Sequence, residues 1–225
     1  MRIVTGGTAQ FRQFIELTRR ACERFGYQCR VYDFGGLGFG TPIEVTNKDF
    51  QNCVPGAMPS CLFKPRVMKD ALAERTGGIT AWLDGDAVLL KPLDELEDLA
   101  FDLAVTLREP QFVGKAHPIM NYLNAGVMFF RDTQQIVDEW ERATDKLGND
   151  QLALNQLIGP GWTDQTWLAS YHTLVATRYG KALILPAAEW NFSQFPRPFG
   201  DARVAHFKGA FRDLFSRYFE EDRLS

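Results

Sequence analysis

The chain has 225 residues, with 25 lysines and arginines against 28 aspartates and glutamates and therefore a formal net charge of −3. Hydrophobic residues make up 45% and charged residues 24% of the sequence, a balance typical of a folded globular protein rather than a disordered one. The slightly acidic balance argues against a general nucleic-acid binder, whose surface is normally basic, although a nucleotide needs only a local positive site.

Strand and helix patterns alternate along the chain without a linker rich in Pro, Gly or Ser, so we expect one domain over residues 1–225. Hydrophobic periodicity and helix-stop residues predict the elements in chain order. The first part of the chain is predicted to form a strand at 3–5, a helix from Thr8 to Gly26, a strand at 29–33, a helix around Pro65 that stops at Gly77, and a strand at 79–83. The second part is predicted to form strands at 101–107 and 123–130, helices from Asp132 and at 151–158, strands at 182–185 and 203–207, and a terminal helix at 211–219. The early β-α-β-α-β order predicts an α/β fold with a mostly parallel, doubly wound sheet. In such sheets ligands bind beyond the carboxyl ends of the strands.

Particular residues mark three of the helix starts. Pro65 suits the first turn of its helix, Asp132 and Gln135 form a capping-box-like start, and Asn149 can cap the short helix that follows it. The glycine-dense segment 34–42 precedes no helix, so it does not fit a dinucleotide-binding fingerprint. We expect it to be a mobile loop near the site.

The four cysteines, Cys22, Cys29, Cys53 and Cys61, include no C-x-x-C pair that would indicate a zinc or redox module. We predict a buried free thiol for Cys22 on the apolar face of its helix, and a reducing compartment. No apolar run approaches the ~18 residues of a membrane-spanning helix, and glycines interrupt the N-terminus before a signal-peptide core could form. The sequence therefore predicts a cytoplasmic protein without a membrane anchor, and it does not indicate the oligomeric state.

Two aspartates follow the near-continuous apolar strand predicted at 79–83, in the segment Asp84-Gly85-Asp86. Gly85 lets the backbone bend, so that both carboxylates can face one cation. Two such carboxylates repel each other unless a cation neutralises them, and their oxygen atoms suit Mg²⁺ or Mn²⁺. A polar turn is the structural alternative, but the apolar residues on both sides of the motif favour a site.

An Asp-x-Asp after a central strand fits two chemistries. The pair can anchor a divalent metal on the diphosphate of a nucleotide-sugar, or it can serve a haloacid-dehalogenase-like phosphatase in which Asp84 is the nucleophile. The phosphatase normally carries this motif near the N-terminus and needs a later acidic pair, and here only Glu220-Glu221-Asp222 at the chain end is available. The phosphatase is therefore the less supported of the two chemistries.

Several segments together resemble glycosyltransferases of the GT-A fold, especially the family-8, glycogenin-like group. Over most of the chain, from about Ile3 to Arg212, the segments that are similar to motifs of this group are Asp84-Gly85-Asp86, Lys91 to Leu96, Asn124-Ala125-Gly126-Val127, Asn149-Asp150-Gln151 and His206-Phe207-Lys208-Gly209. The resemblance implies a GT-A fold, that is, a mixed, mostly parallel sheet with helices on both faces. It also implies a nucleotide-diphosphate sugar, with a UDP-sugar expected, as donor and a hydroxyl group as acceptor.

The resemblance also implies roles for individual residues. Asp84, Asp86 and His206 would hold Mn²⁺ or Mg²⁺, and a nitrogen ligand favours Mn²⁺. Asp150 and Gln151 would act beside the donor sugar as catalytic residues. The residues expected to contact the donor are Thr5, Gly6, Lys64, Asp84, Gly85, Asn124, Gly126, Gly209 and Arg212. His117 and His172 are expected to have loop or packing roles.

One segment departs from the family-8 pattern, in which His-x-x-Gly is followed by x-x-Lys-Pro-Trp. Here Arg212 takes the lysine position and Asp213-Leu214 replaces Pro-Trp. An arginine can still bind a phosphate, through two parallel hydrogen bonds. The sequence thus predicts a metal-dependent glycosyltransferase, with the phosphatase and a non-catalytic nucleotide-sugar-binding module as the alternatives.

Overall fold

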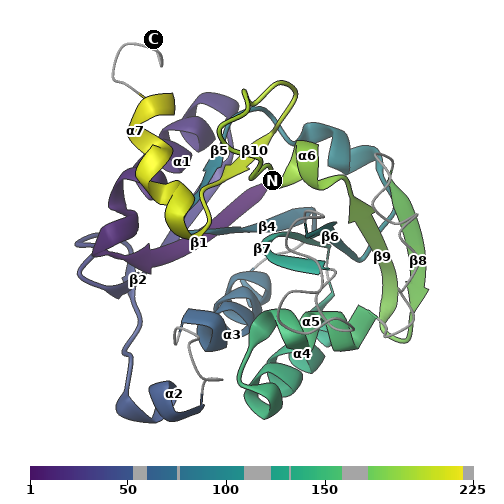
Figure 1. The fold of residues 1–225 in the computed structure, drawn as a ribbon. Helices are drawn as coiled ribbons and strands as arrows, with labels where there is room; N and C mark the ends of the chain where they lie inside the picture. Colours follow the sequence, from purple (N-terminus) through teal and green to yellow (C-terminus); the bar gives the residue numbers. More distant parts are fainter. Residues whose placement is uncertain (53–59, 75–76, 109–122, 132, 159–171, 220–225) are drawn as a thin grey trace.

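An eight-stranded mixed sheet forms the centre of the protein in a computed structural model that describes residues 1–52, 60–74, 77–108, 123–131, 133–158 and 172–219 (Figure 1). The strands are β1 (Arg2–Thr8), β2 (Gln28–Gly35), β3 (Thr41–Pro42), β4 (Ile79–Asp84), β5 (Ala87–Leu89), β6 (Leu103–Leu107), β7 (Leu123–Arg131), β8 (Thr173–Thr177), β9 (Gly180–Leu185) and β10 (Val204–His206). The helices are α1 (Arg12–Phe25), α2 (Asn47–Asn52), α3 (Ser60–Ala73), α4 (Gln134–Leu147), α5 (Asp150–Ile158), α6 (Ala187–Trp190) and α7 (Phe215–Tyr218), with 3-10 turns η1 (Ala9–Phe11), η2 (Asp94–Asp98) and η5 (Gly209–Leu214).

The strands of the large sheet follow the order β3-β2-β1-β4-β7-β6-β9-β8. β1 lies between β2 and β4 and is parallel to both, and β6 is parallel to β9. β7 is antiparallel to its two neighbours, β4 and β6, and β8 is antiparallel to β9, so the sheet is mixed. The predicted mixed, mostly parallel, doubly wound sheet is confirmed.

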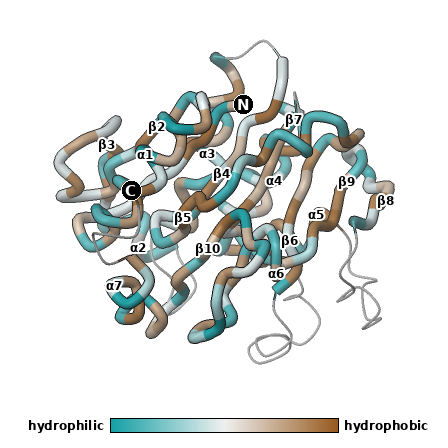
Figure 2. The backbone as a smooth tube through the Cα atoms, turned by 90° about the horizontal axis from the view of Figure 1, so that it is seen from above, coloured by the Kyte–Doolittle hydropathy of each residue, from teal (hydrophilic) through white to brown (hydrophobic). Residues whose placement is uncertain are grey.

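Helices cover both faces of the sheet (Figure 1). On one face, α3, α4 and α5 bury apolar side chains such as Met68, Trp140 and Leu154 against the strands. On the other face, Cys22 of α1 and Trp190 of α6 pack against the opposite sides of the same strands. Burial on both faces explains the near-continuous apolar run of β4, and Figure 2 shows the hydrophobic residues along β4 and β9.

The first helix illustrates how the sequence sets local structure. Phe14, Ile15 and Cys22 of α1 are buried, in agreement with the predicted apolar face and the buried thiol. Gly26 ends the helix with φ +73°, and its N–H bonds to the carbonyl groups of Cys22 and Glu23, as the stop signal predicts. The helix begins later than predicted, because the 3-10 turn η1 follows β1 before α1 starts at Arg12.

A second, two-stranded sheet pairs β5 with β10 in antiparallel register, and His206 lies opposite Ala87. β5 was not predicted as a separate strand, because three residues are too few for a clear pattern. β8, at one edge of the large sheet, was also missed, since its residues are alternately half-buried and exposed. This second sheet matters for function because it brings the end of β10 to the turn that follows β4.

Two helix predictions need correction, and a third falls partly outside the described residues. α3 begins at Ser60, so Pro65 lies in its second turn rather than its first, where it cannot donate the usual hydrogen bond. The predicted terminal helix is instead the 3-10 turn η5 followed by the single turn α7, because its phenylalanines pack into a compact aromatic cluster. Asp132 lies outside the described residues and α4 begins at Gln134, whereas Asn149 caps α5 as predicted, with Oδ1 2.9 Å from the N–H of Leu152.

No helix in the described part of the chain combines the length and the apolar character needed to cross a membrane. Cys22, Cys29 and Cys61 are free thiols, and Cys53 lies outside the described residues. His172 packs edge-on against Trp190, with the ring centroids 6.2 Å apart, which agrees with the predicted packing role, and His117 is outside the described residues.

Candidate functional site

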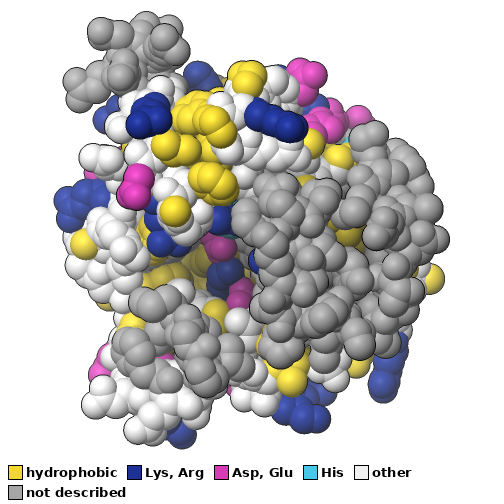
Figure 3. All heavy atoms as spheres, in the orientation of Figure 1, with side chains coloured by type: hydrophobic (Ala, Val, Ile, Leu, Met, Phe, Trp, Pro, Cys, Tyr) yellow, Lys and Arg dark blue, Asp and Glu magenta, His cyan; other side chains and the backbone are white. Residues whose placement is uncertain are grey.

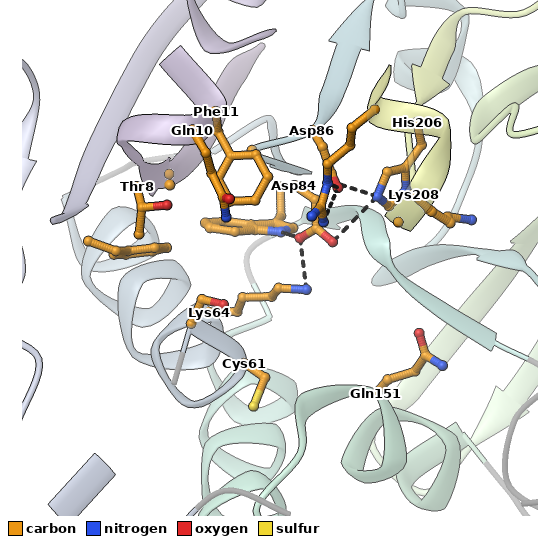
Figure 4. Close-up of a pocket in the computed structure, with 18 of the residues that line it drawn as sticks. Thr8, Gln10, Phe11, Cys61, Lys64, Asp84, Asp86, Gln151, His206 and Lys208 are labelled. Carbon is orange, nitrogen blue, oxygen red and sulfur yellow. Dashed lines mark hydrogen bonds and ion pairs between the residues drawn. The ribbon is translucent and has the colours of Figure 1, made fainter. Parts of the chain in front are cut away.

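A cleft of about 450 Å³ lies at the carboxyl ends of β1 and β4, the location that a doubly wound sheet predicts for a ligand. Figure 3 looks into this hollow, where basic and acidic side chains lie close together. Its walls come from the end of β1 and η1, the start of α3, the turn after β4, the start of α5, and η5. Ten of the residues that line it are labelled in Figure 4.

The turn after β4 carries both aspartates of the Asp-x-Asp motif. Asp84 ends β4, and Asp86 immediately precedes β5. A Cβ atom on Gly85 would lie 2.6 Å from the carbonyl oxygen of Gly6 on β1. Glycine is therefore needed here for the close approach of two backbones, and the tight turn keeps both carboxylates at the cleft.

His206 joins these aspartates because β10 pairs with β5. The N–H of Phe207 bonds to the carbonyl oxygen of Asp86 at 2.9 Å, which fixes the histidine beside the turn. Its Nε2 lies 3.0 Å from Asp86 Oδ1 and 3.7 Å from Asp84 Oδ2. The residue is 4% exposed, and its ring faces the two carboxylates (Figure 4).

The three side chains fit a divalent cation. One potential ligand atom from each of Asp84, Asp86 and His206 lies within 4.8 Å of the others. Two carboxylate oxygens and an imidazole nitrogen form a donor set suited to Mn²⁺ and also acceptable to Mg²⁺. The structure thus brings together the predicted ligand set, while metal binding itself stays a prediction.

Two basic side chains neutralise the carboxylates. Lys64 of α3 places Nζ 2.7 Å from Asp84 Oδ1 and 2.8 Å from Asp150 Oδ2. Burial favours the neutral amine, but the charges of Asp150 and Asp84 outweigh burial and raise the pKa of Lys64. Arg212 of η5 contacts Asp86 Oδ2 through Nε at 2.8 Å and Nη2 at 2.7 Å.

Neighbouring basic groups also act on the pKa of Asp86. Burial favours the protonated acid, but the neighbouring His206 and Arg212 overcome it and lower the pKa of the Asp86 carboxyl group. Asp86 is therefore an anion at neutral pH. An ionised carboxylate is the form that a metal ion requires.

The two predicted catalytic residues, Asp150 and Gln151, differ in their access to the cleft. Gln151 lines the cleft, whereas Asp150 is 3% exposed and is not among the lining residues. Burial, reinforced by the charge of Asp84 and opposed by Lys64, raises the pKa of Asp150. Asp150 thus lies behind Lys64, and its contact with the cleft runs through that lysine.

Asn124 and Gly126, both on β7, support the histidine. Asn124 lines the cleft, and its Oδ1 accepts the N–H of Gly126 at 2.8 Å. A Cβ atom on Gly126 would lie 2.7 Å from His206 Nδ1 and would also overlap Cε1 of the ring. Gly126 therefore makes room for the imidazole, a role that was not anticipated from the sequence.

The remaining predicted residues are placed unevenly. Gly6 and Gly209 line the cleft, but Thr5 does not, because β1 continues to Thr8 and Thr5 lies buried inside the strand. The glycine-dense loop does not line it either, although Phe34 does. The Asp33 carboxylate holds this loop by accepting the backbone N–H groups of Gly35, Leu37 and Gly38.

Other lining residues were missed from the sequence. Gln10 and Phe11 of η1 form part of one wall (Figure 4), and the guanidinium of Arg212 lies 4.8 Å from the centre of the Phe11 ring. Their position directly after the first strand was an available signal, but the apolar periodicity assigned Phe11 to a helix. Trp82, assigned to the core, donates its indole N–H to Asp84 Oδ1 at 2.8 Å.

Comparison with known proteins defines the fold. No protein-family model matches the chain, and no curated protein matches it either. Among solved structures, it is similar to a glycosyltransferase involved in the glycosylation of the major capsid of PBCV-1, at 17% identity and TM-score 0.61 over 95% of this chain and 98% of that one.

Two further structures give the same result. The active-site mutant Q189E of LgtC is 14% identical, with a TM-score of 0.56 over 93% of this chain and 88% of that one. The glycosyltransferase GlyE of Streptococcus pneumoniae TIGR4 is 17% identical, with a TM-score of 0.54 over 98% of this chain and 60% of that one. The chain therefore has a GT-A-like glycosyltransferase fold, as the sequence resemblance predicted.

Proposed function

We propose that this protein is a metal-dependent glycosyltransferase that moves a sugar from a nucleotide-diphosphate sugar, a UDP-sugar, to an acceptor hydroxyl. The observation that carries the proposal is the convergence of Asp84, Asp86 and His206 with the cations Lys64 and Arg212 in one cleft. This cleft lies at the carboxyl edge of the sheet in a fold shared with glycosyltransferases. A diphosphate needs several positive charges, and the constellation can supply them.

Asp84, Asp86 and His206 would hold Mn²⁺ or Mg²⁺ through two oxygen atoms and one nitrogen. When bound, the ion supplies positive charge that stabilises the departing nucleoside diphosphate. The metal would also replace the protein cations as the partner of the aspartates, and this replacement would free Lys64 and Arg212. Both side chains could then contact the diphosphate, together with the backbone of Gly209.

The nucleoside would lie along the opposite wall. Gly6, Gly7, Thr8, Gln10 and Phe11 line the cleft there, and the end of β1 offers backbone groups while the Phe11 ring offers a flat apolar surface. Thr5 would act through the backbone of this strand rather than by direct contact. Gly85 would contribute by keeping the Asp-x-Asp turn against β1.

The donor sugar would lie between Lys64, Asn124 and Gln151. A glycosyl transfer passes through a positively charged, oxocarbenium-like centre, and an amide oxygen such as that of Gln151 can stabilise developing positive charge. Asp150 would orient Lys64 from behind and contribute negative charge at the same place. Its burial makes it the less direct of the two predicted catalytic residues.

A donor screen tests the proposal. The protein is incubated with Mn²⁺ and a panel of nucleotide-sugars, and thermal stabilisation and release of free nucleoside diphosphate are both measured. We expect a UDP-sugar to stabilise the protein against heat and to be turned over, and we expect EDTA to abolish both effects. In Gln151→Ala, turnover should be lowered while Mn²⁺-dependent UDP binding persists. Stabilisation by no nucleotide-sugar would contradict the proposal.

The same assay separates the alternatives. Hydrolysis of a generic aryl phosphate that is lost in Asp84→Asn would indicate the phosphatase. Mn²⁺-dependent UDP binding without turnover across the whole panel would indicate a non-catalytic binding module.

A further inference from the structure

A buried amide directly after α6 connects the candidate metal ligand His206 to two strands of the large sheet. Asn191, which is fully buried, directly follows α6. Its Oδ1 lies 2.9 Å from His206 Nδ1. Its Nδ2 lies 2.9 Å from Asn124 Oδ1 on β7 and 2.7 Å from Thr106 Oγ1 on β6.

A backbone group fixes the direction of every hydrogen bond in this network. The N–H of Gly126 can only donate, so the side-chain atom of Asn124 that it meets at 2.8 Å is the oxygen. That oxygen must in turn face the NH₂ group of Asn191. The Asn191 oxygen consequently faces His206, and the Nδ1 atom of His206 must carry a hydrogen to donate to it.

The backbone holds Asn191 at this place. The N–H of Phe192 bonds to the carbonyl oxygen of Val204 at 2.9 Å, and the N–H of His206 bonds to the carbonyl oxygen of Phe192 at 2.7 Å. These two bonds join the segment after α6 to β10 as a parallel bridge. The amide and the imidazole therefore keep a fixed relative position.

We propose that Asn191 is a positioning residue that holds the Nδ1–H of His206, so that Nε2 is directed at Asp84 and Asp86 as a metal ligand. This inference rests on the proposed metal site. A second hydrogen bond on the far ring nitrogen is the usual device for setting the tautomer and orientation of a histidine ligand. The Asn-Ala-Gly segment of β7 then has two tasks here, because Gly126 makes room for the ring and the Asn124 oxygen orients Asn191.

The ring of His206 can be observed without metal. Nitrogen-15 chemical shifts of the metal-free protein report which ring nitrogens carry hydrogen. We expect Nδ1 to be protonated, with slow exchange of its hydrogen, and this protection to be lost in Asn191→Leu. A neutral ring with a bare Nδ1 and a hydrogen on Nε2 would overturn the inference.

Three variants test the consequence for the metal, with Mn²⁺ affinity measured by calorimetry and folding measured by urea unfolding. Asn191→Leu keeps the shape but removes the acceptor, and it should weaken Mn²⁺ binding roughly 10–100-fold, as loss of an outer-shell partner does elsewhere. Asn191→Asp keeps an acceptor for Nδ1–H, so it should retain Mn²⁺ affinity even though its other oxygen faces Asn124 and lowers stability. Thr106→Val removes a bond to Asn191 without touching His206, and should also lower stability but not affinity.

A purely structural role predicts a different pattern, in which Mn²⁺ affinity falls in step with stability in all three variants. That pattern, or unchanged affinity in Asn191→Leu, would overturn the inference, and so would a lack of saturable Mn²⁺ binding by the unsubstituted protein. If the expected pattern holds but no nucleotide-sugar is turned over, only the proposed function fails.

Discussion

Arg212 directs two nitrogen atoms at a single oxygen of Asp86, with Nε at 2.8 Å and Nη2 at 2.7 Å from Oδ2. The other oxygen of the same carboxylate lies 3.0 Å from His206 Nε2. The aspartate that we expect to hold a metal ion is thus already paired with a protein cation. A metal ion must therefore compete with the Arg212 guanidinium for Asp86. The displaced guanidinium could then bind the diphosphate instead.

Replacement of Arg212 should therefore change the binding of metal and of nucleotide in opposite directions. In Arg212→Gln, Mn²⁺ binds more tightly in the absence of nucleotide, because a competing and repelling charge has been removed. UDP binds more weakly at saturating Mn²⁺, since a charge-assisted hydrogen bond of roughly 1.5–3 kcal/mol is lost. Calorimetry measures both affinities.

The matched control is Arg217→Gln, which removes an exposed arginine of α7 and should leave both affinities unchanged. Weaker Mn²⁺ binding in Arg212→Gln would show that the arginine supports the metal site instead of competing for it.

A methyl group on Gly126 should damage the proposed metal site specifically. The added Cβ would lie 2.7 Å from His206 Nδ1, so the ring has to move and Mn²⁺ affinity should fall by about 10-fold or more, by analogy with displaced metal ligands and their partners. Gly26→Ala serves as control, because Gly26 has φ +73° but open space around it. The control should lose stability while retaining Mn²⁺ affinity, and equal Mn²⁺ affinity in the two variants would contradict the prediction.

Lys64 should stabilise the fold by neutralising two carboxylates. Side chains of Lys64 and Asp150 are 12% and 5% exposed, and removal of one partner from a buried ion pair typically costs about 3–5 kcal/mol. We expect Lys64→Met to lose stability of this order in urea unfolding at pH 7. The double variant Lys64→Met/Asp150→Asn should recover part of the loss, because no uncompensated charge then remains at position 150.

The stability deficit of Lys64→Met, relative to the unsubstituted protein, should also depend on pH. Burial already raises the pKa of Asp150 against the opposing effect of Lys64, so loss of the lysine raises it further. A carboxyl group with a raised folded-state pKa destabilises the fold when it is ionised, and the deficit should shrink as the pH falls through that pKa. A deficit that stays constant on acidification would contradict this explanation.

Asp33 should contribute stability with the opposite dependence on pH. Its slight burial favours the neutral acid, but the N–H groups of Leu37, Gly35 and Gly38 outweigh it and lower the pKa of the Asp33 carboxyl group. The contribution is therefore present above the unfolded-state pKa of about 3.9 and is lost as the pH falls through the folded-state value. Asp33→Asn should unfold at lower urea concentration at pH 7, and its difference from the unsubstituted protein should narrow below pH ~4.

The control for Asp33 is Asp98→Asn at an exposed position of η2. An Asp33→Asn difference that widens on acidification, or one that the control reproduces, would contradict the role of this carboxylate.

Much of the fold followed from patterns local to the sequence. The apolar run of β4 and the Gly26 stop depend on neighbouring residues alone, so the sequence predicted both. The β5–β10 pair could not be predicted in this way, because it joins two three-residue strands that are far apart in the chain. Pro65 was misplaced for a related reason, since the start of α3 depends on tertiary packing rather than on a proline preference.

The site was predicted in part. Asp84, Asp86 and His206 could be proposed together because each belongs to a motif in the correct order, and the structure brings them within reach of one ion. Asn191 carries no motif signal, and its importance appears only when its contacts with His206 and Asn124 are known. Pairing of Lys64 and Arg212 with the aspartates was equally hidden, because it depends on distances between four separate segments.

The most direct test of the central claim compares Asp86→Ala with the unsubstituted protein for Mn²⁺-dependent release of UDP from a UDP-sugar. The account predicts that the variant folds, no longer binds Mn²⁺ at this site, and loses turnover by roughly 10²–10³-fold or more, the cost of a lost electrostatic contact in other active sites. Full metal-dependent turnover in Asp86→Ala would contradict the account.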